Sequence, residues 1–135
     1  MTNGRHQLEG KYIVYEYGIY DGEYEDWALA LYRLRGEDMK EVYHPSDHAR
    51  RPGAIGEEQK GQLIKLIKRK GINKVYSVNH HRDFFGIPPR CVEIPTDEGV
   101  EMQWEEWVPV REGSHSHREL EGEGIEVAFR EEMDW

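Results

Sequence analysis

The stretch EEQKGQLIKLIKRKGINKVYSVNHHRDFFG, residues 57–86, carries the clearest local signals in the chain. Apolar residues at positions 63, 64, 66 and 67 have the spacing that gathers side chains on one face of an α-helix. Acidic residues open this segment and basic residues close it, which suits the helix dipole. Gly71 stands where a left-handed residue ends a helix. The sequence therefore predicts a helix that starts near Glu57 and stops before Gly71, followed by a strand over residues 74–79.

The composition indicates one folded domain. The chain has 135 residues, enough for a hydrophobic core without covalent staples. Its 8 Tyr, 4 Trp and 3 Phe are too many for a disordered segment. One cysteine, Cys91, cannot form an internal disulfide, which favours a reducing compartment. With no apolar leader and no membrane-length apolar run, the sequence predicts a cytoplasmic protein without a membrane segment. No cofactor is predicted.

Charge is distributed unevenly along the chain. Residues 1–47 carry 5 Lys+Arg and 10 Asp+Glu, a net charge of −5. Residues 48–92 carry 10 and 3, a net charge of +7, and residues 93–135 carry 3 and 14, a net charge of −11. The total is the formal net charge of −9. Such asymmetry points to a charged partner.

Strands are predicted on both sides of this central segment. Residues 11–19, KYIVYEYGI, predict a strand with Ile13, Tyr15 and Tyr17 on one face and Val14 on the other. Residues 25–35 fit either a helix or a strand that pairs with residues 40–43, and the strand is favoured slightly. Residues 90–94 and 100–104 predict a hairpin whose second strand is half-buried, since Val100, Met102 and Trp104 alternate with polar residues.

The carboxyl-terminal region predicts less regular structure. Glu105 and Glu106 break the alternation, which indicates a β-bulge. Residues 112–124 are poor in apolar side chains and predict a loop or linker, and residues 125–129 predict an edge strand or docking segment. The predicted organisation is a globular domain over residues 1–111 and an acidic segment over 112–135. The predicted fold is α+β, an antiparallel, partly closed sheet of about six strands with one main packed helix.

Histidines supply the first candidate site. His81 and Asp83 are two residues apart, as are His115 and His117, and together these four side chains are the candidate metal ligands. No sequence signature specific for a metal accompanies them. Surface or loop histidines are the favoured interpretation, with a metal site as the alternative.

Two further candidates use the basic middle of the chain. In a small phosphoesterase or nuclease, His80 or His81 would act as general base, Arg82 would hold a phosphate oxygen and Asp83 would orient the imidazole. In a protein that binds nucleic acid directly, the cations would contact phosphates. The candidate anion-binding residues are Arg50, Arg51, Lys68, Arg69 and Lys74.

The acidic surface supplies the favoured hypothesis. An acidic protein is attracted to basic partners, and large basic surfaces in a cell belong to nucleic-acid-processing complexes. The sequence therefore predicts a non-catalytic binding protein that regulates or inhibits transcription, replication or defence machinery. Carboxylates would steer the encounter and tryptophans would anchor it. The candidate partner-binding residues are Glu105, Glu106, Trp107, Glu131, Glu132, Asp134 and Trp135.

Overall fold

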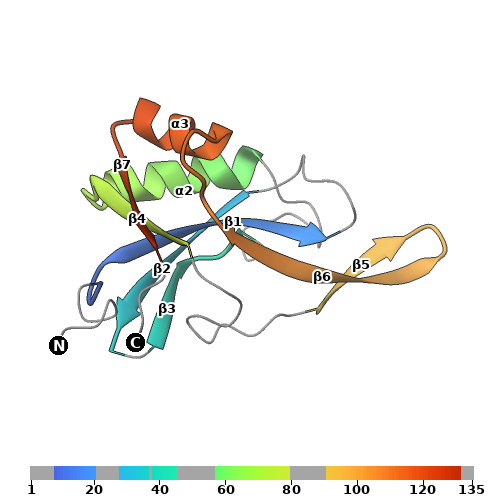
Figure 1. Cartoon of the computed structure of the whole chain (residues 1–135). Coiled ribbons are helices and arrows are strands. Elements are labelled where there is room, and N and C mark those ends of the chain that lie inside the picture. Colours follow the sequence, from blue (N-terminus) through green and yellow to red (C-terminus); the bar gives the residue numbers. More distant parts are fainter. Residues whose placement is uncertain (1–7, 21–27, 37, 46–56, 80–90, 132–135) are drawn as a thin grey trace.

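A computed structural model describes residues 8–20, 28–36, 38–45, 57–79 and 91–131. In these residues seven strands form one sheet and two helices pack on it (Figure 1). In chain order the elements are β1 (Tyr12–Tyr20), β2 (Ala28–Arg35), β3 (Asp38–Tyr43), α2 (Glu57–Arg69), β4 (Lys74–Asn79), β5 (Cys91–Thr96), β6 (Gly99–Pro109), α3 (His115–Gly122) and β7 (Glu126–Glu131).

The sheet is mixed and open, which corrects the predicted antiparallel, partly closed sheet. Its main strand order is β3-β2-β1-β4-β7. Strands β1, β2 and β3 form an antiparallel meander, whereas β4 is parallel to β1 and β7 is parallel to β4. Parallel neighbours require a crossover connection, usually a helix. Helices α2 and α3 lie on these connections, and both cover the same face of the sheet (Figure 1).

Helix α2 confirms the predicted helix and its end. The Gly71 N–H donates to the Lys68 carbonyl at 3.1 Å, and the Ile72 N–H donates to the Ile67 carbonyl at 3.1 Å. With Gly71 at a φ of 74°, this is a Schellman motif, in which a glycine tolerates the left-handed backbone. Leu63 and Ile67 are fully buried and join the core beneath the helix.

Helix α3 corrects the loop predicted for residues 112–124. It starts after Ser114, whose side chain accepts a hydrogen bond from the His117 N–H at 3.2 Å. The helix buries only Ser116 and Leu120, so it lacks the apolar stripe by which a helix is recognised in a sequence. The chain then continues through Ile125, which is buried, into the edge strand β7.

Strand β1 is the centre of the sheet. On one side it pairs with β2, and on the other it pairs with β4 at Ile13 and with β6 from Tyr15 onward. The sheet therefore forks between β4 and β6. A hydrogen bond from the Ser77 hydroxyl to the Val110 carbonyl joins the two branches. Pairing of β1 with residues 104–109 has no register shift, so the bulge predicted at residues 105–106 is absent from this ladder.

Apolar clusters lie on both faces of the sheet. Ile13, Tyr15 and Tyr17 belong to one cluster, while Val14 belongs to the cluster beneath the helices, which confirms the predicted alternation of β1. Strand β2 confirms the strand interpretation of residues 28–35 and its pairing with residues 40–43. Among the described residues, no helix has the length and apolar character required to cross a membrane.

Candidate functional site

The strongest candidate site is a projecting hairpin. Strand β5 pairs with residues 99–104 of β6, and the remainder of β6 pairs with β1. Residues 91–103, here called the arm, therefore extend beyond the main sheet (Figure 1). A two-residue turn at Asp97 and Glu98 closes the arm, and Gly99 follows with a φ of 134°, a backbone angle that favours glycine.

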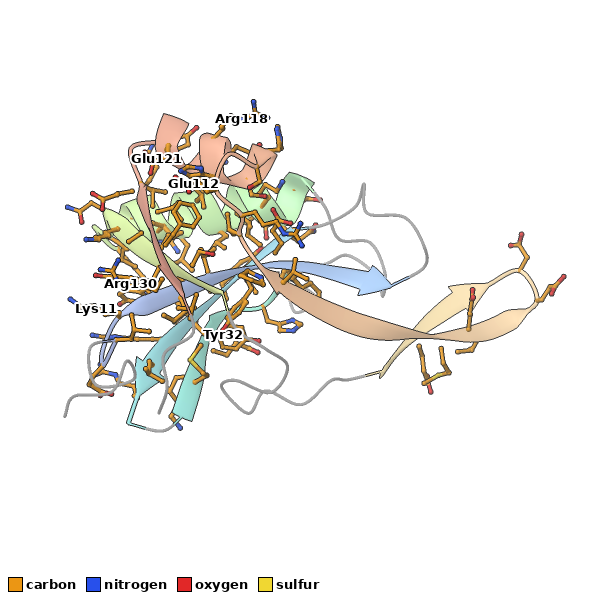
Figure 2. The ribbon with its side chains drawn as sticks, in the orientation of Figure 1. Lys11, Tyr32, Glu112, Arg118, Glu121 and Arg130 are labelled. Carbon is orange, nitrogen blue, oxygen red and sulfur yellow. The ribbon has the colours of Figure 1, made fainter. Side chains whose placement is uncertain are left out.

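The arm exposes apolar side chains. Val100 has 62% of its surface exposed and Met102 has 54%, and they are the large hydrophobic residues with high exposure among those described. This corrects the half-buried strand predicted from their alternation. The alternation is real, but none of the described elements packs on the arm, so Val100 and Met102 stay exposed (Figure 2).

The arm is also acidic. Residues 91–103 contain four carboxylates, at Glu93, Asp97, Glu98 and Glu101, and no Lys or Arg. All four are exposed. In Figure 2, Lys11 and Arg130 lie at the opposite end of the molecule from the arm. The acidic projection is thus separated in space from these basic groups.

The residues predicted to bind a partner lie outside the arm. Glu105, Glu106 and Trp107 form the base of β6, where their backbones pair with β1. Glu131 is the last residue of β7. Glu132, Asp134 and Trp135 lie outside the described residues. The hairpin is therefore predictable from the sequence, whereas its role as a candidate site is not. The signal present was four carboxylates without a cation in 13 residues around a tight turn.

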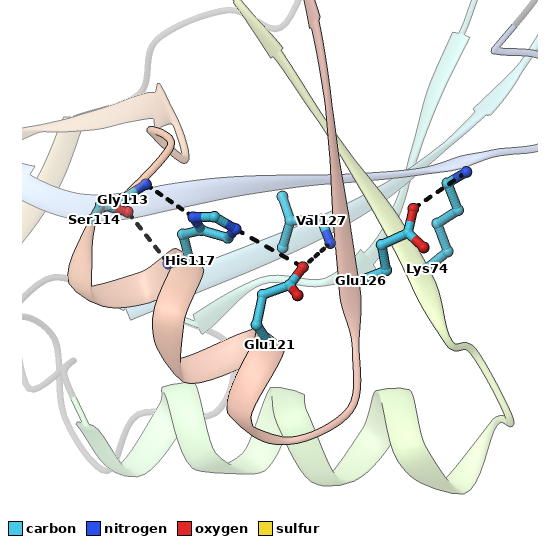
Figure 3. A network of polar contacts seen from close by, with 7 residues as sticks. All are labelled: Lys74, Gly113, Ser114, His117, Glu121, Glu126 and Val127. Carbon is cyan, nitrogen blue, oxygen red and sulfur yellow. Dashed lines mark hydrogen bonds and ion pairs between the residues drawn. The ribbon is translucent and has the colours of Figure 1, made fainter.

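His117 of α3 takes part in a polar network (Figure 3). The Gly113 N–H donates to His117 Nδ1 at 2.8 Å, and His117 Nε2 lies 3.8 Å from Glu121 Oε2. The Val127 N–H donates to the same Glu121 oxygen at 2.9 Å. Because Nδ1 accepts, the proton of a neutral His117 is on Nε2, facing Glu121. The network connects the start of α3 to β7.

His115 occupies a different position. Its Nε2 lies 3.3 Å from Glu119 Oε1, while Glu119 Oε2 lies 3.7 Å from Lys60 Nζ on α2. Each histidine therefore faces the glutamate one turn later on its own helix. In the part of the chain that the structure describes, no group of three His, Cys, Asp or Glu side chains is arranged to hold a metal ion. His81 and Asp83, the other candidate ligands, lie outside that part.

The candidate anion-binding residues lie in different surroundings. Lys68 contacts Glu123 at 3.0 Å and Lys74 contacts Glu126 at 3.4 Å, so carboxylates already partly neutralise both. Arg69 is exposed in the last turn of α2. The Lys74 ammonium also lies 5.4 Å from the Tyr76 ring centroid, within the range of a cation–π interaction. Arg50 and Arg51 lie outside the described residues.

The hydrolase hypothesis concerns residues that follow β4. His80, His81, Arg82 and Asp83 come directly after Asn79, the last residue of that strand, and all four lie outside the described residues.

A shallow groove separates α2 and α3. Its volume is about 370 Å³ and its walls carry both signs of charge. The lining residues are Gly61, Ile64, Lys65, Lys68, Glu119 and Glu123. Because the Lys68–Glu123 ion pair crosses the groove, we interpret it as part of the polar contact between the two helices.

Comparison of the chain with protein-family models, curated protein sequences and solved structures gives no match.

Proposed function

We propose that this chain is a non-catalytic binding protein whose acidic surface docks on a basic surface of a nucleic-acid-processing complex and regulates or inhibits it. The arm is the observation that supports this proposal. It extends from the main sheet, carries four exposed carboxylates and no cation, and adds exposed Val100 and Met102. Carboxylates steer a basic partner toward the arm, and apolar contact then slows dissociation.

Energetics of the arm also favour a bound partner. A two-stranded hairpin is marginally stable in water unless another surface covers it. On the arm, every residue whose exposure the structure describes is exposed. Contact with a partner would bury Val100 and Met102, at about 25 cal/mol for each Å² removed from water. Binding would therefore stabilise the hairpin as well as hold the partner.

The partner class follows from charge. Basic surfaces large enough to accept both the arm and an acidic body are found on proteins that bind nucleic acids. Transcription, replication and defence complexes in the cytoplasm belong to this class. The acidic residues Glu131, Glu132 and Asp134 near the carboxyl terminus, with Trp135, are proposed as a second contact region.

Affinity capture with matched variants tests this proposal. The arm variant combines Glu93→Gln, Asp97→Asn and Glu98→Gln, which removes three negative charges. The control combines Glu112→Gln, Glu123→Gln and Glu126→Gln, which removes the same charge from exposed positions away from the arm. Each tagged full-length chain is incubated with cell lysate, and retained proteins are identified by mass spectrometry.

We expect wild type and control to retain a stoichiometric basic subunit of a nucleic-acid-processing complex, and the arm variant to lose it. Circular dichroism spectra and melting temperatures verify that all three chains are folded. Equal retention by the arm variant would exclude the arm as the docking element. Retention of acidic or neutral proteins alone would contradict the proposed partner class.

A further inference from the structure

The register of the arm places one of its carboxylates beside its two exposed apolar side chains. Glu93 pairs directly with Met102 across the hairpin, and directly opposed residues place their side chains on the same face. Val100 is two residues from Met102 on β6 and therefore shares this face. Glu101 lies between them and points to the opposite face. One face of the arm thus combines Val100, Met102 and Glu93, and is here called the mixed face.

The mixed face has the character of a recognition surface. Its two large apolar side chains are more than half exposed, and a carboxylate stands beside one of them. Methionine is unbranched and polarizable, so it adapts to differently shaped apolar partners. No Lys or Arg of the arm competes for Glu93. A complementary ligand must therefore carry apolar groups with a cation next to them.

The spacing of Val100 and Met102 suits a helical ligand. Val100 and Met102 are two residues apart on one strand, a separation of about 7 Å. Residues i and i+4 of an α-helix are about 6 Å apart along its axis. A helix with apolar residues at i and i+4 can thus cover both side chains at once.

We propose that the mixed face of the arm binds a basic amphipathic helix of the partner, with Val100 and Met102 covering the apolar stripe and Glu93 contacting a flanking Lys or Arg. This inference rests on the proposed function and specifies the partner segment. Recognition of an amphipathic helix by an apolar surface through i and i+4 anchors is a general mode of peptide binding. Asp97 and Glu98, at the turn, extend the acidic rim at the end of the face.

Synthetic peptides test the inference without knowledge of the partner. One labelled 18-residue peptide places Leu at i and i+4 positions and Lys on the flanks, so that it forms an amphipathic helix. A second peptide has the same composition in scrambled order. Fluorescence anisotropy with the full-length chain at about 0.15 M salt, where charges more than about 8 Å apart are largely screened, measures both dissociation constants.

We expect the amphipathic peptide to bind at least about tenfold more tightly than the scrambled peptide. Met102→Gln should weaken binding of the amphipathic peptide about tenfold, because the amide cannot replace the lost apolar contact. Glu93→Gln and Glu101→Gln each remove one charge from the same hairpin. The dissociation constant of the Glu93→Gln variant should nevertheless be about three times that of the Glu101→Gln variant. Circular dichroism should show an increase in peptide helicity on binding.

Two results would overturn the inference. Equal affinities for the two peptides would mean that charge alone attracts them, and equal losses from Glu93→Gln and Glu101→Gln would mean that the two faces are equivalent. Neither result would contradict the proposed function, because the capture experiment tests that function separately. Loss of capture by the arm variant together with equal peptide affinities would support the proposed function and exclude recognition of an amphipathic helix.

Discussion

Tyr43 shows how one side chain fixes an element. Its hydroxyl lies 2.9 Å from the Gln59 carbonyl oxygen and 3.0 Å from Gln62 Oε1, so the last residue of β3 is tied to the first turns of α2. Burial, and then the negative charge of Glu58, raise the pKa of Tyr43 to about 12. The neutral phenol is therefore favoured in the folded protein.

This raised pKa predicts alkaline destabilisation. The contribution of Tyr43 is complete below pH 10, the ordinary tyrosine pKa, and is lost as the pH rises toward 12. One pKa unit corresponds to about 1.4 kcal/mol, so the loss from this residue is at most about 3 kcal/mol. Urea unfolding between pH 9 and 11.5 should show a shallower decline for Tyr43→Phe than for wild type. Tyr12→Phe is the matched control, and parallel curves for Tyr43→Phe and wild type would refute the assignment.

At the scale of elements, α3 depends on its first turn. Ser114 has an extended backbone (φ −71°, ψ 167°) and accepts from the N–H three residues later, the geometry of an N-cap. The N3 residue is His117, which accepts the Gly113 N–H, much as the N3 Glu of a capping box accepts a backbone N–H. Two backbone donors at the start of a helix of eight residues are thus satisfied by side chains.

Ser114→Ala should therefore lower the free energy of unfolding by about 1 kcal/mol. Ser114→Asp is the matched control, because aspartate caps as well as serine and should retain wild-type stability. Urea denaturation monitored by circular dichroism measures both changes. If Ala and Asp were equally destabilising, the serine would contribute through packing rather than through its cap.

Elements differ in how well the sequence predicts them. Helix α2 is predictable because its apolar face and Gly71 agree with each other, and β1 because its alternation is regular. Helix α3 is not, since Leu120 is its one large buried residue and the pattern S-x-x-H replaces the usual S-x-x-E signal. The parallel pairing of β4 with β7 is not predictable for the same reason, because the connection between these strands contains α3.

The arm shows how much of the candidate site the sequence can predict. The hairpin is evident from the alternation of residues 100–104, but that alternation implies a buried face. Whether a face is covered depends on elements far away in sequence, and none of the described elements reaches Val100 or Met102. The pairing of residues 104–109 with β1 is likewise non-local. It ties the predicted partner residues Glu105–Trp107 to the main sheet.

At the scale of the whole molecule, the carboxyl-terminal segment contributes to the core. Leu120, Ile125 and Val127 are all buried in the cluster beneath the helices. Removal of residues 112–135 would delete these side chains, at about 1.5–3 kcal/mol each, and expose the edge of β4. The sum, about 5–9 kcal/mol, is comparable with the total stability of a domain, about 5–15 kcal/mol.

The 1–111 fragment should therefore fail to fold cooperatively. Thermal unfolding followed by circular dichroism and size-exclusion chromatography should show a broad transition and association of the fragment. A chain ending at residue 131 is the control, since it retains α3 and β7 and should melt as wild type does. A sharp transition of the 1–111 fragment within a few degrees of wild type would show that the amino-terminal region folds independently.

The fork at β1 has a consequence for synthesis on the ribosome. Strand β2 is synthesised soon after β1 and can pair with it almost at once. The second edge of β1 pairs with β4 and β6, which are synthesised later, and Pro109 of β6 pairs with Tyr15. At about 5–20 residues per second, the roughly ninety intervening residues take about 5–20 s to emerge. During that interval a nascent, tyrosine-rich strand presents unpaired backbone groups to neighbouring chains. We therefore expect the yield of native protein in cells to depend on translation speed and on chaperones that shield strand edges.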